Sequence, residues 1–335
     1  MIHDVTRRHA LTLALRLSGA GAALARPAIA QQAPVVPGVA RIVVGFAAGG
    51  SADIVARLLA ERLRMSSYAQ AVIVENRVGA AGRLAVEAVK GARPDGTTIL
   101  LTPSSMLTIF PHLYQRSLRY DPFADLVAVS PAGEFYFGMG VGPKAGMATN
   151  LADFLSWARS QPDIPYGSAA AGSALHFLGV QFAKAAGLPM THVSYRGSAP
   201  AVQGLIAGET AASFHPMVDL VPNQRSGMIS IVAVSSEQRL LRLPDVPTFT
   251  EQGYPQLTGS EWFGAFLPVR TPPGTVGALH RGVAEASANH EYQAALARIE
   301  LTPLPMAPAA FAARMGAEYE KWGPVIAESG FRPEE

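Results

Sequence analysis

The feature that most constrains the fold is a repeated unit, in which a short apolar run ends in a turn of small residues and an amphipathic helix follows. The clearest copy is VGFAAGGSADIVARLL, residues 44–59. Apolar runs at 71–75 and 98–102 also end in turns of small or polar residues. Strands that alternate with helices are typical of a doubly wound sheet, in which each helix crosses over to the next parallel strand. The pattern therefore predicts an α/β fold.

The second half of the chain repeats this rhythm. Helices are predicted at 151–160, 173–186 and 198–207, and strands at 164–167, 193–195, 211–214 and 229–234. Apolar strands near 135–141 and 262–268 are available to run between the halves, and residues 274–328 look mostly helical. We predict two lobes, each a mostly parallel sheet flanked by helices, joined by two hinge crossings around a cleft. The first lobe is expected to comprise the segments 37–135 and 265–335, and the second lobe the segment 136–264.

The segment 1–30 is expected to be an export signal rather than part of the fold. It carries Arg7 and Arg8, then a weakly apolar stretch, and it ends in the cleavage-site pattern Ala28-Ile29-Ala30. The arginine pair leaves a twin-arginine signal and the general export route both open. Arg16 interrupts the apolar stretch, and no later segment has the roughly 18 uninterrupted apolar residues that a membrane span needs. The expected location is the periplasm, after cleavage following Ala30.

Charge and cysteine content exclude some classes of function. The chain has 27 basic and 25 acidic residues, and the segment 1–30 holds four of the arginines and one aspartate. The mature chain therefore has 23 basic and 24 acidic residues and a net charge of −1. Such a chain has no electrostatic footprint for nucleic acid. It has no cysteine, so stability has to come from an apolar core.

Four turns between a strand and a helix are candidate binding sites: residues 46–53, 76–83, 172–176 and 195–198. The first amides of a helix lack partners within the helix, and the helix dipole favours negative charge there. Such turns can hold a carboxylate without a cationic side chain. Within the first turn, Ser51 is expected to cap the helix, and Asp53 is expected to be structural rather than catalytic.

Ser173 and His176 raise the alternative of a periplasmic hydrolase with a nucleophile and its base. Ser173 is explained equally well as a helix cap, and the chain has no GxSxG elbow. For His176, the sequence leaves open a hydrogen bond across the cleft or a satisfied interior position. The histidines show no metal-ligand spacing, and no phosphate loop or dinucleotide fingerprint occurs. We therefore predict no catalytic residue, no metal and no cofactor.

Taken in order, these turns resemble the Bug family, the substrate-binding proteins of tripartite tricarboxylate transporters. The matching blocks include IVVGFAAGGSADIVARLLAERL, VIVENRVGAAG, GSALHFLGVQFAKAAG, VSYRGSAPAVQGLIAGE and EWFGAFLPVRTPPG. Together the blocks cover nearly all of residues 40–330. The resemblance implies a two-lobed, type II-like periplasmic binding protein fold. It also implies a monomer that closes on a small organic carboxylate and delivers it to membrane permease subunits without turnover.

The resemblance further implies that backbone amides and waters of these turns hold the ligand. The predicted ligand-binding residues, to which Ser104 after the third strand is added, are Phe46, Ala48, Gly49, Gly50, Asp53, Ser104, Ser168, Ser173, Ala174, His176, Tyr195, Arg196 and Gly197. Arg196 stands where lysine is more usual in the family. It is expected either to bind a carboxylate as a fork or to be an exposed or lobe-bridging arginine.

Three departures from the family pattern bear on specificity. Gly45 replaces the usual proline before Phe46, which is expected to loosen the turn. Arg83 brings a cation near the expected pocket mouth, where it would favour a second carboxylate if it points inward. His215 follows Phe214 where an acidic residue is common. The sequence leaves the ligand open among monocarboxylates, dicarboxylates, aromatic acids and amino acids.

Two further binding functions share this layout. One is an orphan receptor that presents its ligand to a sensor kinase, which the sequence does not separate from a transport receptor. The other is the effector-binding half of a transcription regulator. The signal segment and the lack of a helix-turn-helix argue against the regulator.

Overall fold

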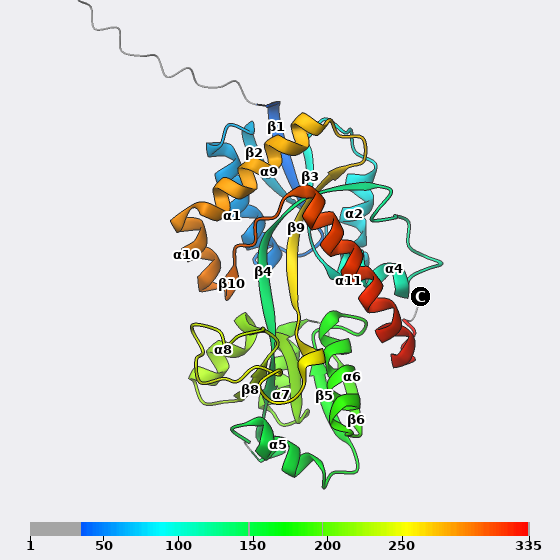
Figure 1. Cartoon of the computed structure of the whole chain (residues 1–335), viewed down its shortest axis with the longest axis vertical. Coiled ribbons are helices and arrows are strands. Elements are labelled where there is room, and N and C mark those ends of the chain that lie inside the picture. The colour runs from blue at the N-terminus through cyan, green and yellow to red at the C-terminus, as the bar shows by residue number, and fades with distance from the viewer. Residues whose placement is uncertain (1–34, 147, 196, 334–335) are drawn as a thin grey trace, which may run out of the picture. The chain divides into compact units, whose positions relative to one another are not determined.

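Strand β4 (Leu126–Val141) organises the fold because it belongs to both sheets of the structure. The computed structural model describes residues 35–146, 148–195 and 197–333, which lie in one unit of the chain, Pro34–Glu335. The predicted signal segment and Arg196 lie outside the described residues. Up to Tyr136, β4 pairs with β9 (Ser260–Pro268), and from Phe137 onward it pairs with β7 (Ala212–Pro216). One strand therefore passes from the first lobe to the second (Figure 1).

The first lobe is built on the sheet order β2-β1-β3-β9-β4. Its parallel strands β1 (Val36–Val44), β2 (Ala69–Asn76) and β3 (Thr98–Pro103) each run into a turn and a helix. The helices are α1 (Ser51–Met65), α2 (Arg83–Lys90), α3 (Ser105–Thr108), α4 (Phe110–Leu113), α9 (Pro273–Ala288) and α10 (His290–Arg298). A short strand, β10 (Leu301–Thr302), pairs with the edge of β4. The crossing strands add antiparallel pairs, so the sheet is mixed.

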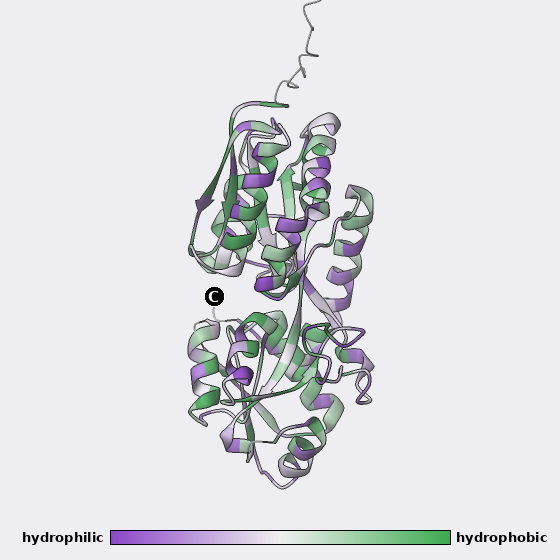
Figure 2. Ribbon diagram, turned by 90° about the vertical axis from the view of Figure 1, so that its left-hand side faces the viewer, coloured by the Kyte–Doolittle hydropathy of each residue, from purple (hydrophilic) through white to green (hydrophobic). Residues whose placement is uncertain are grey.

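The second lobe repeats this plan around β5 (Ile164–Ser168), which is parallel to β6 (Met190–Ser194) and β7. Strand β8 (Ser230–Val234) pairs antiparallel with β4. The helices are α5 (Leu151–Ala158), α6 (Ala174–Ala186), α7 (Ser198–Ile206) and α8 (Met217–Arg225). In Figure 2 polar and apolar residues alternate along the helices of both lobes, which is typical of helices with one face against a core.

The chain returns from the second lobe to the first at Ser235 and Gly259. The amide of Gly259 donates to Ser235 O at 2.9 Å, and the Ser235 hydroxyl donates to Gly259 O at 2.7 Å. The Ser235 amide donates in turn to Phe137 O on β4 at 2.9 Å. The two crossings are therefore bonded to each other where they pass between the sheets.

The C-terminal helix α11 (Pro308–Ser329) contacts both lobes. Its first half packs on the first sheet, where the Phe311 and Trp262 rings lie 4.7 Å apart. Its second half reaches α6, where Trp322 and Phe177 rings lie 6.1 Å apart and Lys184 pairs with Glu328 at 2.6 Å. Figure 1 shows α11 running from beside β9 to α6. The helix is thus a third connection that a movement of the lobes has to accommodate.

Most elements predicted from periodicity are present, and Ser173 and Gly187 lie at the ends of α6 as predicted. The prediction that Ser51 caps α1 is wrong. Gly50 occupies the N-cap position of α1, no side chain caps that helix, and Ser51 is already helical. Four elements that were not predicted, α3, α4, α8 and β10, are short or lack a clear period in the sequence. No helix in the described part of the chain is long and apolar enough to cross a membrane.

Candidate functional site

In the first lobe, the turn between β1 and α1 is held by the carboxylate of Asp53. This residue is 2% exposed and accepts hydrogen bonds from the Gly49 amide and from Arg57 Nε, both at 2.9 Å. The Asn76 amide group donates to Asp53 Oδ1 at 2.9 Å and to Phe46 O at 3.0 Å. The hydrogen bond from Arg57 is the largest cause that lowers the pKa of Asp53 to about 2. Asp53 therefore braces the turn as an anion, and its oxygens face protein donors.

This bracing changes which amides of the turn are free. The Gly49 amide is bonded to Asp53, and the Gly50 amide makes a long contact of 3.4 Å with Ala47 O. The amides of Ser51, Ala52 and Asp53 stand in the first turn of α1, where no intrahelical partner exists, since the first helical bond is that of the Ile54 amide to Gly50 O. These three amides, at the positive end of a 15-residue helix, are the donors that a ligand anion can use. Ala48 and Gly50 are exposed beside them.

The lack of a side chain at position 45 has a structural reason in this chain. A Cβ placed on Gly45 would lie 2.6 Å from Gly82 Cα, so the backbone of the turn after β2 packs directly against the end of β1. A Cβ on Gly82 would in turn lie 3.2 Å from the Phe46 ring. The expectation that Gly45 loosens the turn is therefore wrong, because the missing side chain allows a closer approach of two turns.

Arg83, whose direction the sequence left open, stacks on an aromatic ring. Its guanidinium carbon lies 4.1 Å from the Tyr114 ring centroid, and its Nε donates to Ala80 O at 3.0 Å. A cation over a ring face is attracted by the ring quadrupole. Arg83 is thereby held at the surface of the first lobe, between α2 and the residue that follows α4.

The turn after β3 lies against a candidate functional residue that was not predicted from the sequence. This residue is Glu261 on β9, whose carboxyl group reaches the turn. Ser104 is 5% exposed, and the next amide, that of Ser105, donates to Glu261 Oε1 at 3.1 Å. Burial raises the pKa of the Glu261 carboxyl, and hydrogen bonds from Ser105 and Ser104 oppose this only in part. In sequence, Glu261 is one polar residue at the start of an apolar strand, and only the pairing of β3 with β9 brings it beside Ser104.

In the second lobe, the turn between β5 and α6 is held by uncharged side chains. Ser173 Oγ accepts from the His176 amide at 3.3 Å and donates to Ala170 O at 2.7 Å. The ring nitrogen Nδ1 of His176 accepts from the Gly172 amide at 3.1 Å. The amides of Ala174 and of the residue after it remain as the free donors at the start of α6.

A second histidine supports this turn from β6. The His176 and His192 rings stack 4.0 Å apart, and His192 Nε2 lies 2.8 Å from Ser168 Oγ. Burial lowers the pKa of His176 to about 4 and that of His192 to about 3. Both rings are therefore neutral at pH 7. His176 is 5% exposed and lies against Phe331, so the structure favours the interior position that the sequence left open.

The next turn of the second lobe leads from β6 into α7. The Gly197 amide donates to Ala169 O at 2.8 Å, which ties this turn to the one before α6. The Tyr195 hydroxyl donates to Glu209 at 2.8 Å, and burial is the largest cause that raises the pKa of Tyr195 to about 12. The Tyr195 side chain thus points toward the far end of α7, and its hydroxyl is bonded away from the free amides of that helix.

The predicted residues form one group in each lobe. In the first lobe Phe46, Gly49 and Asp53 share one bonded turn, and in the second lobe Ser168, Ser173, His176 and Gly197 belong to two turns bonded to each other. The lobes approach each other at Gly172, where an added Cβ would lie 3.0 Å from Leu113 Cδ1 of α4. Among the described residues, each group presents helix amides rather than charged side chains, which suits an organic anion.

The same geometry bears on the hydrolase alternative. Ser173 Oγ gives its proton to a backbone carbonyl, and His176 Nδ1 accepts from a backbone amide, so the two side chains do not form a nucleophile and base pair. Among the described residues, no group of three histidine, aspartate or glutamate side chains is placed to hold a metal ion.

Comparisons with known proteins identify the family and the fold of this chain. The model of the tripartite tricarboxylate transporter family receptors matches residues 55–331. Protein BugT of Bordetella pertussis is 32% identical over 312 residues, which cover 93% of this chain and 94% of BugT. The R. palustris protein Rpa4515, solved with adipate, superposes with a TM-score of 0.79 at 28% identity over 89% of this chain and 99% of its own. MatC from Rhodopseudomonas palustris, solved with bound malate, gives 0.74 at 27% identity over 87% and 99%.

These matches confirm the resemblance to Bug proteins and the predicted α/β periplasmic binding protein fold. They also agree with the prediction of a receptor rather than an enzyme, because the matched family consists of solute receptors. The chain belongs to the tripartite tricarboxylate transporter receptor family.

Proposed function

We propose that this receptor binds a small organic carboxylate between its lobes and delivers it, unchanged, to the permease subunits of a tripartite tricarboxylate-type transporter. The carboxylate is held by the free amides at the start of α1 in one lobe and of α6 and α7 in the other. Ligand contacts both lobes only when they are closed, so it shifts the population toward the closed state. The permease then recognises that state.

The observation that carries this proposal is the pair of structural neighbours that hold adipate and malate, two carboxylic acids. In this chain the helices that follow β1 and β5 begin without a cationic side chain. Hydrogen bonds between residues of the same segment hold the turns before these helices in place. A carboxylate therefore finds preorganised dipoles rather than a salt bridge. The named site residues remain predictions on this basis.

Export fits the same function. The segment up to Ala30 has the layout of a cleaved signal, and a receptor of this kind meets its ligand outside the cytoplasmic membrane. We propose that the mature protein begins near Gln31 and acts in the periplasm as a monomer. N-terminal sequencing of the exported protein and its mass in solution test both statements.

A thermal-shift screen of the mature protein against a library of carboxylates tests the binding function. A ligand at about a hundred times its Kd stabilises the folded state by roughly 2.7 kcal/mol, which is readily seen as a rise in Tm. Neutral sugars serve as the control class. The proposal fails if sugars raise the Tm and acids do not, or if NMR shows that the bound acid is consumed.

An orphan receptor for a sensor kinase would bind its ligand in the same way. Deletion of the gene separates the two roles, because a transport receptor is needed for uptake of the isotope-labelled ligand. A sensor would leave uptake intact and change only a transcriptional response.

A further inference from the structure

The buried carboxyl group of Glu261 has no role in the anion site described above, although it lies at the end of β3, the strand that neighbours β1 in the first sheet. Glu261 is 8% exposed, and its Oε1 accepts from the Ser105 amide at 3.1 Å. Within the described part of the chain, no lysine or arginine pairs with it. An acidic group next to a site for anions is costly unless a partner reaches it, because like charges at close range disfavour each other.

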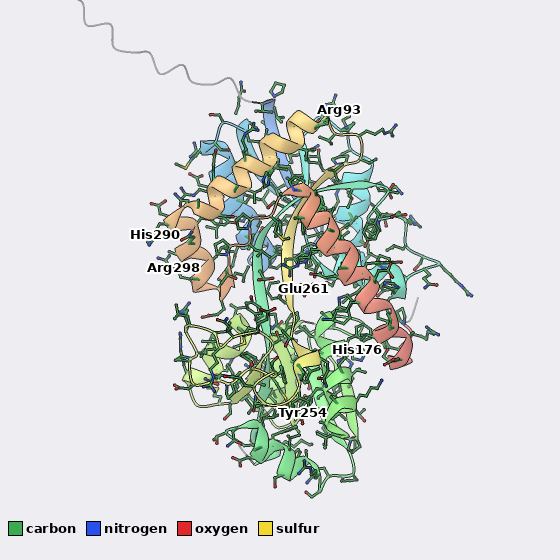
Figure 3. The ribbon with its side chains drawn as sticks, in the orientation of Figure 1. Arg93, His176, Tyr254, Glu261, His290 and Arg298 are labelled. Atoms are coloured by element: carbon green, nitrogen blue, oxygen red, sulfur yellow. The ribbon has the colours of Figure 1, made fainter. Side chains whose placement is uncertain are left out.

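The pairing of β9 shows which way Glu261 faces. Trp262 points toward α11, since its Nε1 donates to Glu318 at 3.0 Å and its ring packs on Phe311. Successive side chains of a strand point to opposite faces, so Glu261 points away from α11. Its contact with Ser105 places it at the end of β3, and the strand ends are where ligands lie in open α/β sheets. Figure 3 labels Glu261 on β9 and His176 at the start of α6.

Aromatic residues neighbour Glu261 on this face of the sheet. Phe135 is its direct partner across the ladder with β4, and Phe263 follows at the next position of β9 on the same face. The Phe135 ring lies 5.1 Å from that of Phe263 and 5.8 Å from that of Phe137. Directly opposed side chains have Cβ atoms about 5 Å apart, so the side chains of Phe135 and Glu261 are neighbours on this face.

A carboxyl group flanked by aromatic rings matches one ligand group better than any other, an ammonium. The carboxylate supplies the opposite charge and accepts the N–H bonds, while ring faces attract a cation through their quadrupole. A second ligand carboxylate at this position would meet a like charge and apolar rings. The nearby cation Arg314 is on the other face of the sheet and is already bonded to Glu134 at 2.8 Å and to Glu318 at 2.7 Å.

We propose that Glu261 is a specificity-determining residue which selects ligands that carry an ammonium group beside their carboxylate. This proposal rests on the function proposed above. The ligand is then a zwitterionic amino acid or a related amine-bearing acid, with its carboxylate on the helix amides and its ammonium at Glu261. The receptor discriminates against plain dicarboxylates such as those held by its structural neighbours.

Calorimetric titration with matched pairs of acids tests this selection. The pairs are aspartate and succinate, glutamate and glutarate, phenylalanine and 3-phenylpropanoate, and leucine and 4-methylpentanoate. At pH 7.5 at least one amino acid is expected to bind the wild-type protein at least tenfold more tightly than its partner without the amine. Glu261→Gln keeps the shape but cannot ionise to pair with an ammonium, and it is expected to weaken amino-acid binding at least tenfold while changing binding of the partner acid less than threefold.

Glu237→Gln is the matched control, because it removes an exposed acid from a loop of the second lobe. Its binding is expected to equal that of the wild type, and the circular dichroism spectrum and Tm of each variant establish that it is folded. If the acids without an amine bind as tightly as the amino acids, or if Glu261→Gln changes both classes alike, the selection by Glu261 is wrong while the carboxylate receptor stands. If no acid of either class binds, both proposals fail.

Discussion

The two turns that offer helix amides to the cleft are built on the same strand-turn-helix plan but are held by opposite chemistry. The turn before α1 depends on one buried anion, Asp53, with a pKa of about 2, and on its bonds to Arg57 and Asn76. The turn before α6 depends on Ser173 and on neutral histidine rings, of which His176 has a pKa of about 4. One lobe thus carries a fixed negative charge beneath its turn, and the other carries none.

This difference shows two ways in which the turn before a helix can be preorganised. In the first lobe the negative charge of Asp53 is compensated by Arg57, so that the exposed amides keep their positive character. In the second lobe the side chains stay neutral because they are buried, and their lone pairs orient the amides directly. Each lobe should therefore respond differently to packing changes, to charge removal and to acid.

Among single substitutions, the largest expected effect comes from the close packing of turns in the first lobe. Gly45→Ala places a Cβ 2.6 Å from the backbone of Gly82, and we expect it to lower the free energy of unfolding by about 3 kcal/mol. Urea unfolding followed by circular dichroism measures this change. Gly50→Ala is the control, since its nearest neighbour would be 3.5 Å away, and it should cost less than about 1 kcal/mol. Equal costs would show that the two turns do not pack as described.

Removal of the buried charge should come next. We expect Asp53→Asn to lower the free energy of unfolding by about 2 kcal/mol, because charged hydrogen bonds to Gly49 and Arg57 become weaker. The same change should weaken ligand binding by loosening the turn before α1. Glu61→Gln, on the exposed side of the same helix and paired only with Arg64 at the surface, is the control and should have almost no effect. A stable Asp53→Asn protein would contradict the bracing role.

As the pH falls, the histidines of the second lobe should lose their contribution to the free energy of unfolding before Asp53 of the first lobe does. His176, His192 and His215 have pKa values of about 4, 3 and 4, below the ordinary 6.5. The unfolded chain therefore binds more protons below pH 6.5, and stability present above that pH is lost as pH falls toward 4. Each histidine contributes a slope of about 1.4 kcal/mol per pH unit. The Asp53 contribution is lost only between its ordinary pKa of 3.8 and about 2.

Unfolding measured by tryptophan fluorescence at pH 7.5 and pH 5 checks this order. His192→Gln is expected to reduce the loss of stability between these two pH values, because a glutamine does not titrate. The interpretation is contradicted if the wild-type protein is as stable at pH 5 as at pH 7.5, or if the variant loses as much as the wild type.

The smallest effect is expected at the cap of α6. Ser173→Ala removes the bond to the His176 amide and should cost about 1 kcal/mol of stability. Ligand binding should weaken by less than tenfold, because the free amides of the helix remain. Ser51→Ala is the control, since Ser51 does not cap α1, and its Tm should stay unchanged. If Ser51→Ala lost more stability than Ser173→Ala, Ser51 rather than Ser173 would be the residue that caps its helix.

Periodicity was sufficient to predict the long elements, including α1 and α6, and with them the four turns that link a strand to a helix. It was not sufficient to assign what holds each turn. Ser51 and Ser173 look alike as caps in the sequence, yet only Ser173 accepts a helix amide, because Gly50 takes the N-cap position in the first lobe. Arg83 could not be oriented without knowing that Tyr114, which is distant in the sequence, lies under it.

By itself the sequence determined the α/β repeat and the helix starts, because these follow from local periodicity and turn chemistry. Tertiary structure decided the rest. Strand pairing brought Glu261 to Ser104 and Phe135, and burial made His176 and His192 neutral supports rather than bases. Contacts between residues far apart in the chain depend on which strands are neighbours in the sheet, and no local pattern encodes that order.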